Sequence, residues 1–372
     1  MKNIKGSWKI GRLAGIDLNI HLTFLILLVW VAFSTLLSGA SLSSVVGEVL
    51  FILTLFLCVV LHELGHALAA RRFGIPTKDI TLLPIGGVAR LETMPEDPKE
   101  ELLVAAAGPA VNVLIGVVLF VGLLISGTLA QPLNTTLLMD NFWLRLLSVN
   151  ISLVLFNLIP AFPMDGGRVL RSILAARMDY VKATRKAANI GRGFAVAMGI
   201  AGFFVNPLLI LTAVFIWSGA GAEAKSVEIR RGLRGLRVRD ALISQFYTVD
   251  ANQPLADVFQ LAMQTGQHNT PVVSNGHFLG IIQRHDLLNA LDRLGDRAPA
   301  YAAIGTEPKG LDPEMPLQDV LPKFTTSRIL PVVDNHQLIG LITPESIEQR
   351  MWLNQHSKSV DASPPEETTH PA

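Results

Sequence analysis

Long apolar stretches separated by short polar breaks fill the first 225 or so residues, and the rest has the pattern of an ordinary soluble module. A helix rises ~1.5 Å per residue, and a hydrocarbon core of ~30 Å needs about 20 mainly apolar residues. The pattern therefore predicts an α-helical membrane domain with six transmembrane helices. We expect them at Ile20–Leu37, Val49–Ala70, Leu102–Ile125, Phe142–Ile159, Ala187–Phe204 and Pro207–Ala220.

Basic residues are distributed unevenly between the ends of these stretches. The loops Ser38–Ser44 and Gly127–Asn141 contain no Lys or Arg, whereas the opposite ends carry many, beginning with Arg71 and Arg72. By the positive-inside rule this predicts a multi-pass protein of the cell membrane with both termini in the cytoplasm. Arg145 is the exception, and we expect its long side chain to extend to the membrane interface.

The soluble part contains an internal repeat. The segment Thr270–Asp286 matches Leu330–Ser346 at a constant offset, and Pro254–Val258 matches Pro316–Val320. Each copy reads as helix, strand, turn, strand and helix, with a proline opening the first helix. The polar, proline-rich tail 356–372 is expected to be disordered.

Composition agrees with a membrane protein. Charged residues make up 16% of the chain, against ~25% in soluble domains. The net charge of +1 gives no case for binding nucleic acid. Cys58 is the only cysteine, so the chain forms no internal disulfide, and we interpret Cys58 as a packing residue.

The second apolar stretch carries His62, Glu63 and His66. Ionisable residues at such depth cost about 2.5–3.5 kcal/mol each on insertion scales, which makes them candidates for a functional site. Residues four apart share a helix face, so two imidazoles can bind one zinc ion. Glu63 lies about 100° around the helix, where it can act as general base on a water beside the metal. His-Glu-x-x-His is the pattern of zinc proteases.

A third ligand is needed to complete a two-histidine zinc site, and a carboxylate commonly supplies it. Asp165 follows Pro160 and Pro163, which break the fourth stretch at or near membrane depth. Irregular backbone is tolerated there only when protein or a wet cavity surrounds it. The alternative is that Asp165 caps a helix at 166–178. We expect His62, His66 and Asp165 to hold one zinc ion per chain.

Two further segments lie between these motifs. The segment Lys78–Glu92 has β-branched and apolar residues around Gly86-Gly87, which predicts a hairpin. It is either a surface hairpin or a membrane-associated one with an open strand edge next to the metal. The third stretch contains Gly108-Pro-Ala-Val-Asn112, where glycine permits close helix approach and Asn112 faces protein, with helix packing as the simpler interpretation.

Taken together, these motifs resemble the site-2 protease family of intramembrane zinc metalloproteases. The resemblance spans about residues 10–225 and is carried by His62–His66, Pro84–Arg90, Gly108–Asn112 and Asn157–Arg168. It implies that His62, His66 and Asp165 are zinc ligands and that Glu63 is the catalytic base. It also implies that Asn157 and Asn112 hold the substrate or the oxyanion.

The repeat resembles a pair of CBS domains, as in the branch of the family that lacks a PDZ domain. The expected fold is therefore a polytopic α-helical membrane domain with a β-hairpin, followed by an α/β tandem CBS domain. The expected boundaries are 1–225 for the protease domain, 236–293 and 299–355 for the CBS domains, and 356–372 for the tail. A homodimer through the CBS domains is a further expectation.

The resemblance implies hydrolysis of peptide bonds within or near transmembrane segments of membrane proteins in the lipid bilayer, with products released to the cytosol and regulation through the CBS pair. One alternative is a CBS-gated transporter with a His/Asp ion site, in which Glu63 would have no evident role. Another is a protease-like binding protein without turnover, against which the intact set of residues argues.

CBS repeats that bind adenine nucleotides typically carry Gly-x-x-Thr-x-x-Asp. The first copy keeps Gly280 and Asp286 but has Gln283 at the Thr position. The second copy has Gly340 and Thr343 but ends in Ser346. A missing carboxylate removes a charge-assisted hydrogen bond worth about 1.5–3 kcal/mol. Asp286 and Thr343 are therefore the candidate nucleotide contacts, and we expect weak binding at no more than one site, near Asp286.

Overall fold

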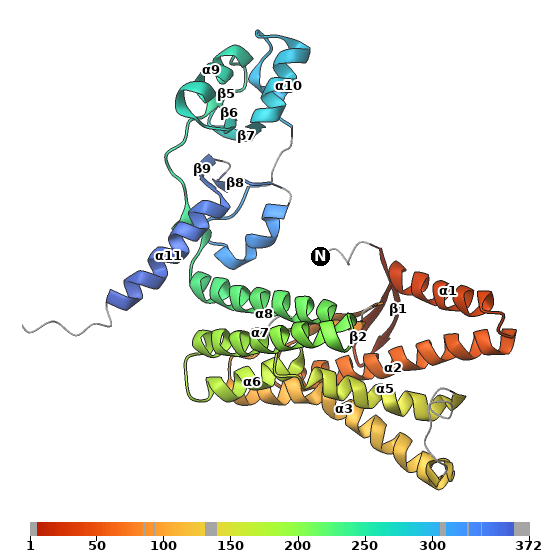
Figure 1. Cartoon of the computed structure of the whole chain (residues 1–372). Helices are drawn as coiled ribbons and strands as arrows, with labels where there is room; N and C mark the ends of the chain where they lie inside the picture. The colour runs from red at the N-terminus through yellow and green to blue at the C-terminus, as the bar shows by residue number, and fades with distance from the viewer. Residues whose placement is uncertain are drawn as a thin grey trace, which may run out of the picture. The chain divides into compact units, whose positions relative to one another are not determined.

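The computed structural model describes residues 6–84, 86–91, 94–130, 140–305, 310–325, 327–335 and 337–360. The chain divides into two compact units, Met1–Val227 and Glu228–Ala372. The first unit is built mainly of helices, and the second alternates short strands with helices (Figure 1).

Among the described residues, seven α-helices form most of the first unit, and the axes of α2, α7 and α8 lie roughly parallel (Figure 1). By length and composition, α2, α3, α7 and α8 are able to cross a membrane, while α1 and α5 are shorter apolar helices. The helices are α1 (Leu22–Leu37), α2 (Leu42–Arg72), α3 (Pro98–Ile125), α5 (Phe142–Asn157), α6 (Asp165–Ala175), α7 (Tyr180–Phe204) and α8 (Leu208–Leu233).

Local signals fix the ends of the two helices that carry the first motifs. Helix α2 starts after Ser41, whose hydroxyl accepts a hydrogen bond from Ser44 N, and Arg71 and Arg72 occupy its last turn. Asp97 caps α3 in the same way, and Pro98 follows at the first helical position. Capping oxygens satisfy amides that lack a helical partner, and basic residues complement the carbonyl end.

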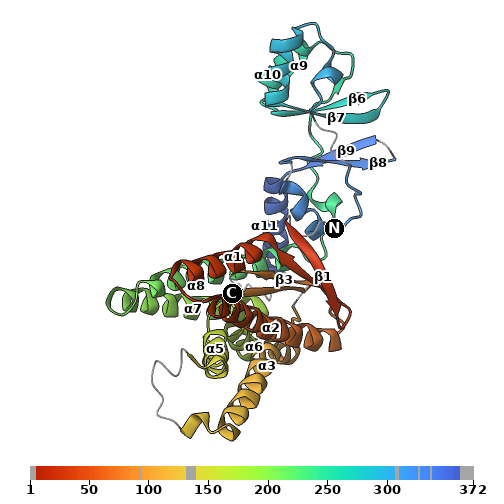
Figure 2. The same ribbon diagram turned by 90° about the vertical axis from the view of Figure 1, so that its right-hand side faces the viewer.

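A four-stranded sheet lies beside these helices, and Figure 2 shows β1 and β3 at one side of them. Strands β3 and β4 are antiparallel, and β2 joins β3 in parallel. Asp79 of β3 accepts a hydrogen bond from Arg90 Nε of β4 at 2.8 Å and raises the pKa of that guanidinium. The strands are β1 (Ser7–Leu13), β2 (Ile16–His21), β3 (Thr77–Leu83) and β4 (Gly86–Leu91).

This sheet corrects two details of the sequence interpretation. Gly86 and Gly87 begin strand β4 rather than forming the turn. The apolar run from Ile20 starts as the end of β2, so α1 begins only at Leu22 and has 16 residues. Glu92, the end of the predicted hairpin segment, lies outside the described residues.

Helices α2 and α3 approach each other closely at Gly65. A Cβ built on Gly65 would lie 2.8 Å from the carbonyl oxygen of Ala107, a distance that real side chains do not reach. Small residues allow such close backbone contact between membrane helices. The two helices are therefore held side by side at the level of His62 and His66.

Arg145 has partners that the sequence interpretation did not name. Its guanidinium forms two hydrogen bonds to Glu48 of α2, at 2.6 and 2.8 Å, and lies 3.8 Å from the ring centroid of Phe51. Cys58 is buried and receives a 3.6 Å contact from Asn150 Nδ2, as expected for a packing residue.

The second unit contains the two repeats. In the first, helices α9 and α10 lie on one side of the sheet β5–β7 (Figures 1 and 2). In the second, β8 and β9 pair with the same hairpin register as β6 and β7. The elements are β5 (Val249–Asp250), α9 (Leu255–Thr265), β6 (Asn269–Ser274), β7 (His277–Gln283), α10 (Arg284–Leu294), β8 (Leu330–Asp334), β9 (Gln337–Ile342) and α11 (Pro344–Val360).

Two expectations for this unit are wrong. The segment after Pro316 forms only short 3₁₀ turns, at Leu317–Asp319 and Leu321–Thr325, in place of the predicted helix. Helix α11 continues to Val360, so the first residues of the predicted tail 356–372 are helical, and residues 361–372 lie outside the described part.

Candidate metal centre and catalytic cavity

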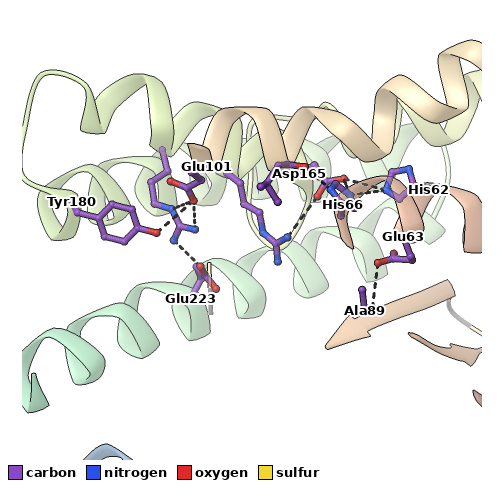
Figure 3. Close-up of polar contacts among 11 residues, drawn as sticks. His62, Glu63, His66, Ala89, Glu101, Asp165, Tyr180 and Glu223 are labelled. Carbon is purple, nitrogen blue, oxygen red and sulfur yellow. Dashed lines mark hydrogen bonds and ion pairs between the residues drawn. The ribbon is translucent and has the colours of Figure 1, made fainter. Parts of the chain in front are cut away.

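Three buried side chains from two distant segments converge in the first unit. His62 Nε2 and His66 Nε2 of α2 are 3.1 Å apart, and Asp165 Oδ2 of α6 lies 3.2 and 3.1 Å from them (Figure 3). Zinc–ligand bonds of about 2.0–2.2 Å place tetrahedral ligand atoms roughly 3.3 Å apart. The triangle therefore has the size that one zinc ion requires.

The hydrogen bond of His66 supports a cation at this point. His66 Nδ1 lies 2.7 Å from the carbonyl oxygen of Val104. A carbonyl only accepts, so Nδ1 carries the proton and the Nε2 lone pair points toward His62 and Asp165. Lone pairs of two imidazoles and a carboxylate at this distance repel one another unless a positive charge lies among them. The donor set therefore fits zinc.

Asp165 is not a helix cap. It is the first residue of α6, while Met164 occupies the N-cap position and makes no capping hydrogen bond through its side chain. Its other oxygen, Oδ1, lies 3.8 Å from Arg168 Nη1. The structure thus brings Asp165 to the histidines, as the ligand interpretation requires.

Glu63 lies beside the triangle but is outside it. Its Oε2 accepts a hydrogen bond from the backbone amide of Ala89 in β4 at 3.2 Å (Figure 3). A Cβ on Gly87 would lie 2.8 Å from Glu63 Cγ, so this glycine makes room for the carboxylate side chain. The sheet therefore holds Glu63 next to the candidate metal ligands.

A cavity of about 420 Å³ opens at these residues and is also lined by Asn112, Asn157, Arg168 and Phe215. Asn112 is 1% exposed, and neither atom of its amide has a hydrogen-bond partner among the described residues. Buried amides are nearly always bonded, so an unpartnered one at a cavity wall is available for a ligand. Asn157, at the end of α5, faces the same cavity.

Gly108 of α3 packs directly on the two histidines. A Cβ at this position would lie 2.2 Å from His66 Nε2 and 2.7 Å from His62 Nε2. Sequence reasoning assigned this glycine to helix packing, whereas the structure shows that it leaves space for the ligand atoms themselves.

We expect Gly108→Ala to weaken zinc binding by at least about tenfold, in the range found for residues that support metal ligands. The methyl group displaces an imidazole from the triangle. Gly116→Ala is the matched control on the same helix, since its Cβ would meet only Leu147 Cδ1 at an ordinary 3.8 Å. Zinc content measured by mass spectrometry of the purified variants checks this, and equal zinc in both variants would contradict it.

The two candidate nucleotide contacts lie in the second unit, one in each repeat. Asp286 is in the first turn of α10, and a Cβ on Gly305 would lie 2.3 Å from its Oδ2. Thr343 Oγ1 accepts a hydrogen bond from Ser346 N, and Ser346 Oγ accepts one from Thr343 N. Thr343 and Ser346 thus cap α11 reciprocally, which engages the Thr343 hydroxyl within the protein.

Several groups at this site leave no recognisable pattern in the sequence. The Val104 carbonyl and the Ala89 amide belong to the backbone, and any residue type supplies them. Phe215 reaches the cavity from α8, far along the chain. Arg168 is part of the Asp-Gly-Gly-Arg segment, but only the structure places it at the cavity wall beside Asp165.

Comparisons with known proteins agree with this geometry. The model of peptidase family M50 matches residues 50–138 and 128–202, and the CBS domain model matches 238–293 and 304–351. A zinc metalloprotease of Methanocaldococcus jannaschii is 32% identical over 93% of this chain and 96% of its own. The stage IV sporulation protein FB of Bacillus subtilis is 31% identical over 46% of this chain and 56% of its own.

This chain also matches the solved structure of a site-2 protease from Methanocaldococcus jannaschii, with 37% sequence identity and a TM-score of 0.42. The match covers 59% of this chain and 95% of the site-2 protease chain. The family match includes His62, His66 and Asp165, and a relative above 30% identity extends over almost the whole chain. The chain therefore belongs to peptidase family M50 and is a zinc metalloprotease.

Proposed function

We propose that this protein hydrolyses peptide bonds within or near transmembrane segments of membrane proteins and releases products to the cytosol. The observation that carries the proposal is the zinc-sized triangle of His62, His66 and Asp165 beside Glu63, on helices apolar enough to cross a membrane. The three residues would be the zinc ligands, one ion per chain. The test is release of peptides from membrane proteins that requires both zinc and Glu63.

The residues that line the cavity would have different roles in peptide hydrolysis. Zinc, when bound, lowers the pKa of a neighbouring water and polarises the substrate carbonyl. Glu63 accepts the proton of that water and later donates it to the leaving amine. The amide N–H groups of Asn112 and Asn157 would donate hydrogen bonds to the carbonyl oxygen as negative charge develops on it.

A substrate helix must open locally before this chemistry, because its peptide bonds are engaged in the helix's own hydrogen bonds. Strand β4 is the last strand of its sheet, and its Ala89 amide is next to Glu63. An unwound substrate segment would add to the free side of β4 as a further strand. This favours a membrane-associated hairpin over a purely surface one.

Two rival functions explain the site less well. A transporter with a His/Asp ion site gives Glu63 no task, and relatives named as zinc metalloproteases support the protease. A binding protein without turnover would not need a carboxylate hydrogen-bonded beside three metal ligands. Peptide cleavage lost on zinc removal and regained on zinc addition separates the protease from both.

The membrane arrangement we propose has six spans, with α1 and α5 joining the four longer helices. Sixteen residues extend about 24 Å, short of a ~30 Å core, which the bilayer accommodates by local thinning. Loops without Lys or Arg would lie outside the cell and both termini in the cytoplasm. The proposed domains are 1–225, 236–293 and 299–355.

Single cysteines at Ser43 and Ser244 test this topology. Both positions are exposed, and the one native cysteine, Cys58, is buried and gives little background. We expect a membrane-impermeant thiol reagent to label Ser43→Cys in intact cells and to label Ser244→Cys only after the cells are opened. The reverse pattern would contradict the proposed topology.

The CBS pair would bind adenine nucleotide weakly and at one site at most, near Asp286. The Thr343 hydroxyl accepts a hydrogen bond that caps α11. The second repeat also has Ser346 where nucleotide-binding repeats carry an aspartate. The pair would then serve mainly in dimerisation or docking. We expect calorimetric titration of the full chain with ATP, ADP or AMP to show no more than one weak site, which Asp286→Ala removes. Two sites of micromolar affinity or better would contradict this.

A further inference from the structure

A buried ionic cluster lies near the metal centre and takes no part in the chemistry above. Arg171 of α6 is wholly buried and donates from Nε to Glu101 Oε1 of α3 at 2.7 Å. Its Nη1 donates to Glu223 Oε1 of α8 at 2.6 Å. Figure 3 shows Glu101, Tyr180 and Glu223 around this guanidinium. We call these four residues the Arg171 cluster.

Aromatic rings complete the surroundings of the guanidinium. Its central carbon lies 4.9 Å from the ring centroid of Phe162 and 5.0 Å from that of Tyr180. Glu101 is also wholly buried. Removing such charges from water costs several kcal/mol per ion, and apolar residues of similar size often give equal stability. Stability alone therefore does not explain the cluster, and fixing one arrangement of helices is the best-attested use of such a group.

Helices α6 and α3 connect the cluster to the surroundings of the metal centre. On α6, Asp165 is the first residue and Arg171 follows six residues later, about 9 Å along the axis. On α3, Glu101 precedes Val104, the acceptor of His66, by one turn and Gly108 by two. Asp165 thus meets the histidines at one end of the α3–α6 contact, and Arg171 meets Glu101 at the other.

We propose that Arg171 is a positioning residue, which locks α6 against α3 and α8 so that Asp165 reaches both histidines. This rests on the proposed role of Asp165 as a zinc ligand. A slip of one residue along α6 moves Asp165 by about 1.5 Å, whereas metal–ligand distances are held within about 0.2 Å. The Arg171 cluster would therefore determine the affinity for zinc and the arrangement of ligand atoms around the ion.

The test uses the full chain in detergent with Arg171→Lys and Glu101→Gln. Lysine keeps the charge but loses the planar fork that reaches two carboxylates, and glutamine keeps the shape but loses the charge. We expect both variants to bind zinc about 10- to 100-fold more weakly, the range found for residues that orient metal ligands. With cobalt(II) in place of zinc, we expect a weaker and shifted visible absorption band, because the tetrahedral arrangement is disturbed.

Glu48→Gln is the control for losing an ion pair between helices in general, because Glu48 forms a partly exposed ion pair with Arg145 between α2 and α5. That pair is 14 residues, about 21 Å, from His62 along α2. We expect zinc affinity within about twofold of the original chain and an unchanged cobalt band. An equal loss in Glu48→Gln would show general loosening of the helices and overturn the proposal.

Two more variants distinguish a failure to fold from a failure of the positioning role or of the ligand assignment. If Arg171→Lys does not fold, Glu223→Gln decides, because that side chain is 31% exposed and tolerates change better. Unchanged zinc affinity and an unchanged cobalt spectrum in the folded cluster variants would overturn the proposal. Asp165→Ala with full zinc would instead overturn the ligand assignment on which it rests.

Discussion

Glu63→Gln is expected to lower the rate of proteolysis by about 10²- to 10⁴-fold, the usual contribution of a general base, while each chain still holds one zinc ion. Glu63 is not among the three ligand atoms, and its Oε2 is hydrogen-bonded to the Ala89 amide. Glutamine still accepts that hydrogen bond through its carbonyl, but it does not take a proton from water. The measurements are cleavage rate and zinc content of the same purified sample.

Glu48→Gln is the control for this experiment, because it makes the same substitution in the same helix but near the other end. It should keep both activity and zinc. Loss of zinc in Glu63→Gln would make Glu63 a ligand, and retained activity would remove it from the mechanism.

Asp165→Ala should lose zinc and activity together. Structural zinc sites bind with about 10–16 kcal/mol, so one ligand of four accounts for on the order of 3 kcal/mol, about a hundredfold in affinity. The substitution also leaves the two Nε2 atoms, 3.1 Å apart, without the carboxylate. Zinc affinity is measured by competition with a chromophoric chelator.

Asp179→Ala is the matched control for Asp165→Ala. Asp179 likewise lies at the start of a helix, where it caps α7 by accepting a hydrogen bond from Val181 N. Losing that cap costs about 1 kcal/mol of stability but should leave zinc affinity unchanged. Full zinc occupancy in Asp165→Ala would contradict the ligand assignment.

The candidate zinc ligands on α2 were predictable from the sequence because their spacing leaves a local pattern. His62 and His66 are one helical turn apart within an apolar run, and a third ligand had to be sought elsewhere. From the sequence Asp165 fitted both a ligand and a helix cap, and only the structure shows that it lies 3.1 Å from His66 Nε2, which supports the proposed ligand role. The long apolar stretches also predicted the longer helices, because a membrane span needs about 20 mainly apolar residues.

Features that depend on contacts between distant segments were not predictable in this way. Strand β2 pairs with β3 about 60 positions away, so the short polar-apolar pattern of 16–21 gave no indication of a sheet. Arg171 meets Glu101 and Glu223 across 70 and 52 positions. Arg145 likewise finds Glu48 across 97 positions, which a rule for lone basic residues near an interface does not anticipate.

The second repeat shows another limit. Its match to the first in the hairpin is close, and both hairpins form with the same register. The match at Pro316 is short, and there the chain forms 3₁₀ turns instead of a helix. Five matching residues do not carry enough buried apolar surface to fix a helix, which depends on tertiary packing.

The most direct test of intramembrane proteolysis compares cells that make the unaltered protein with cells that make Glu63→Gln at the same level. Fragments of membrane proteins released to the cytosol are identified by mass spectrometry with labelled new termini. The result expected is a set of fragments with termini inside or beside transmembrane segments, present only with the unaltered protein. The same fragments at equal abundance in both cells would contradict the proposed function.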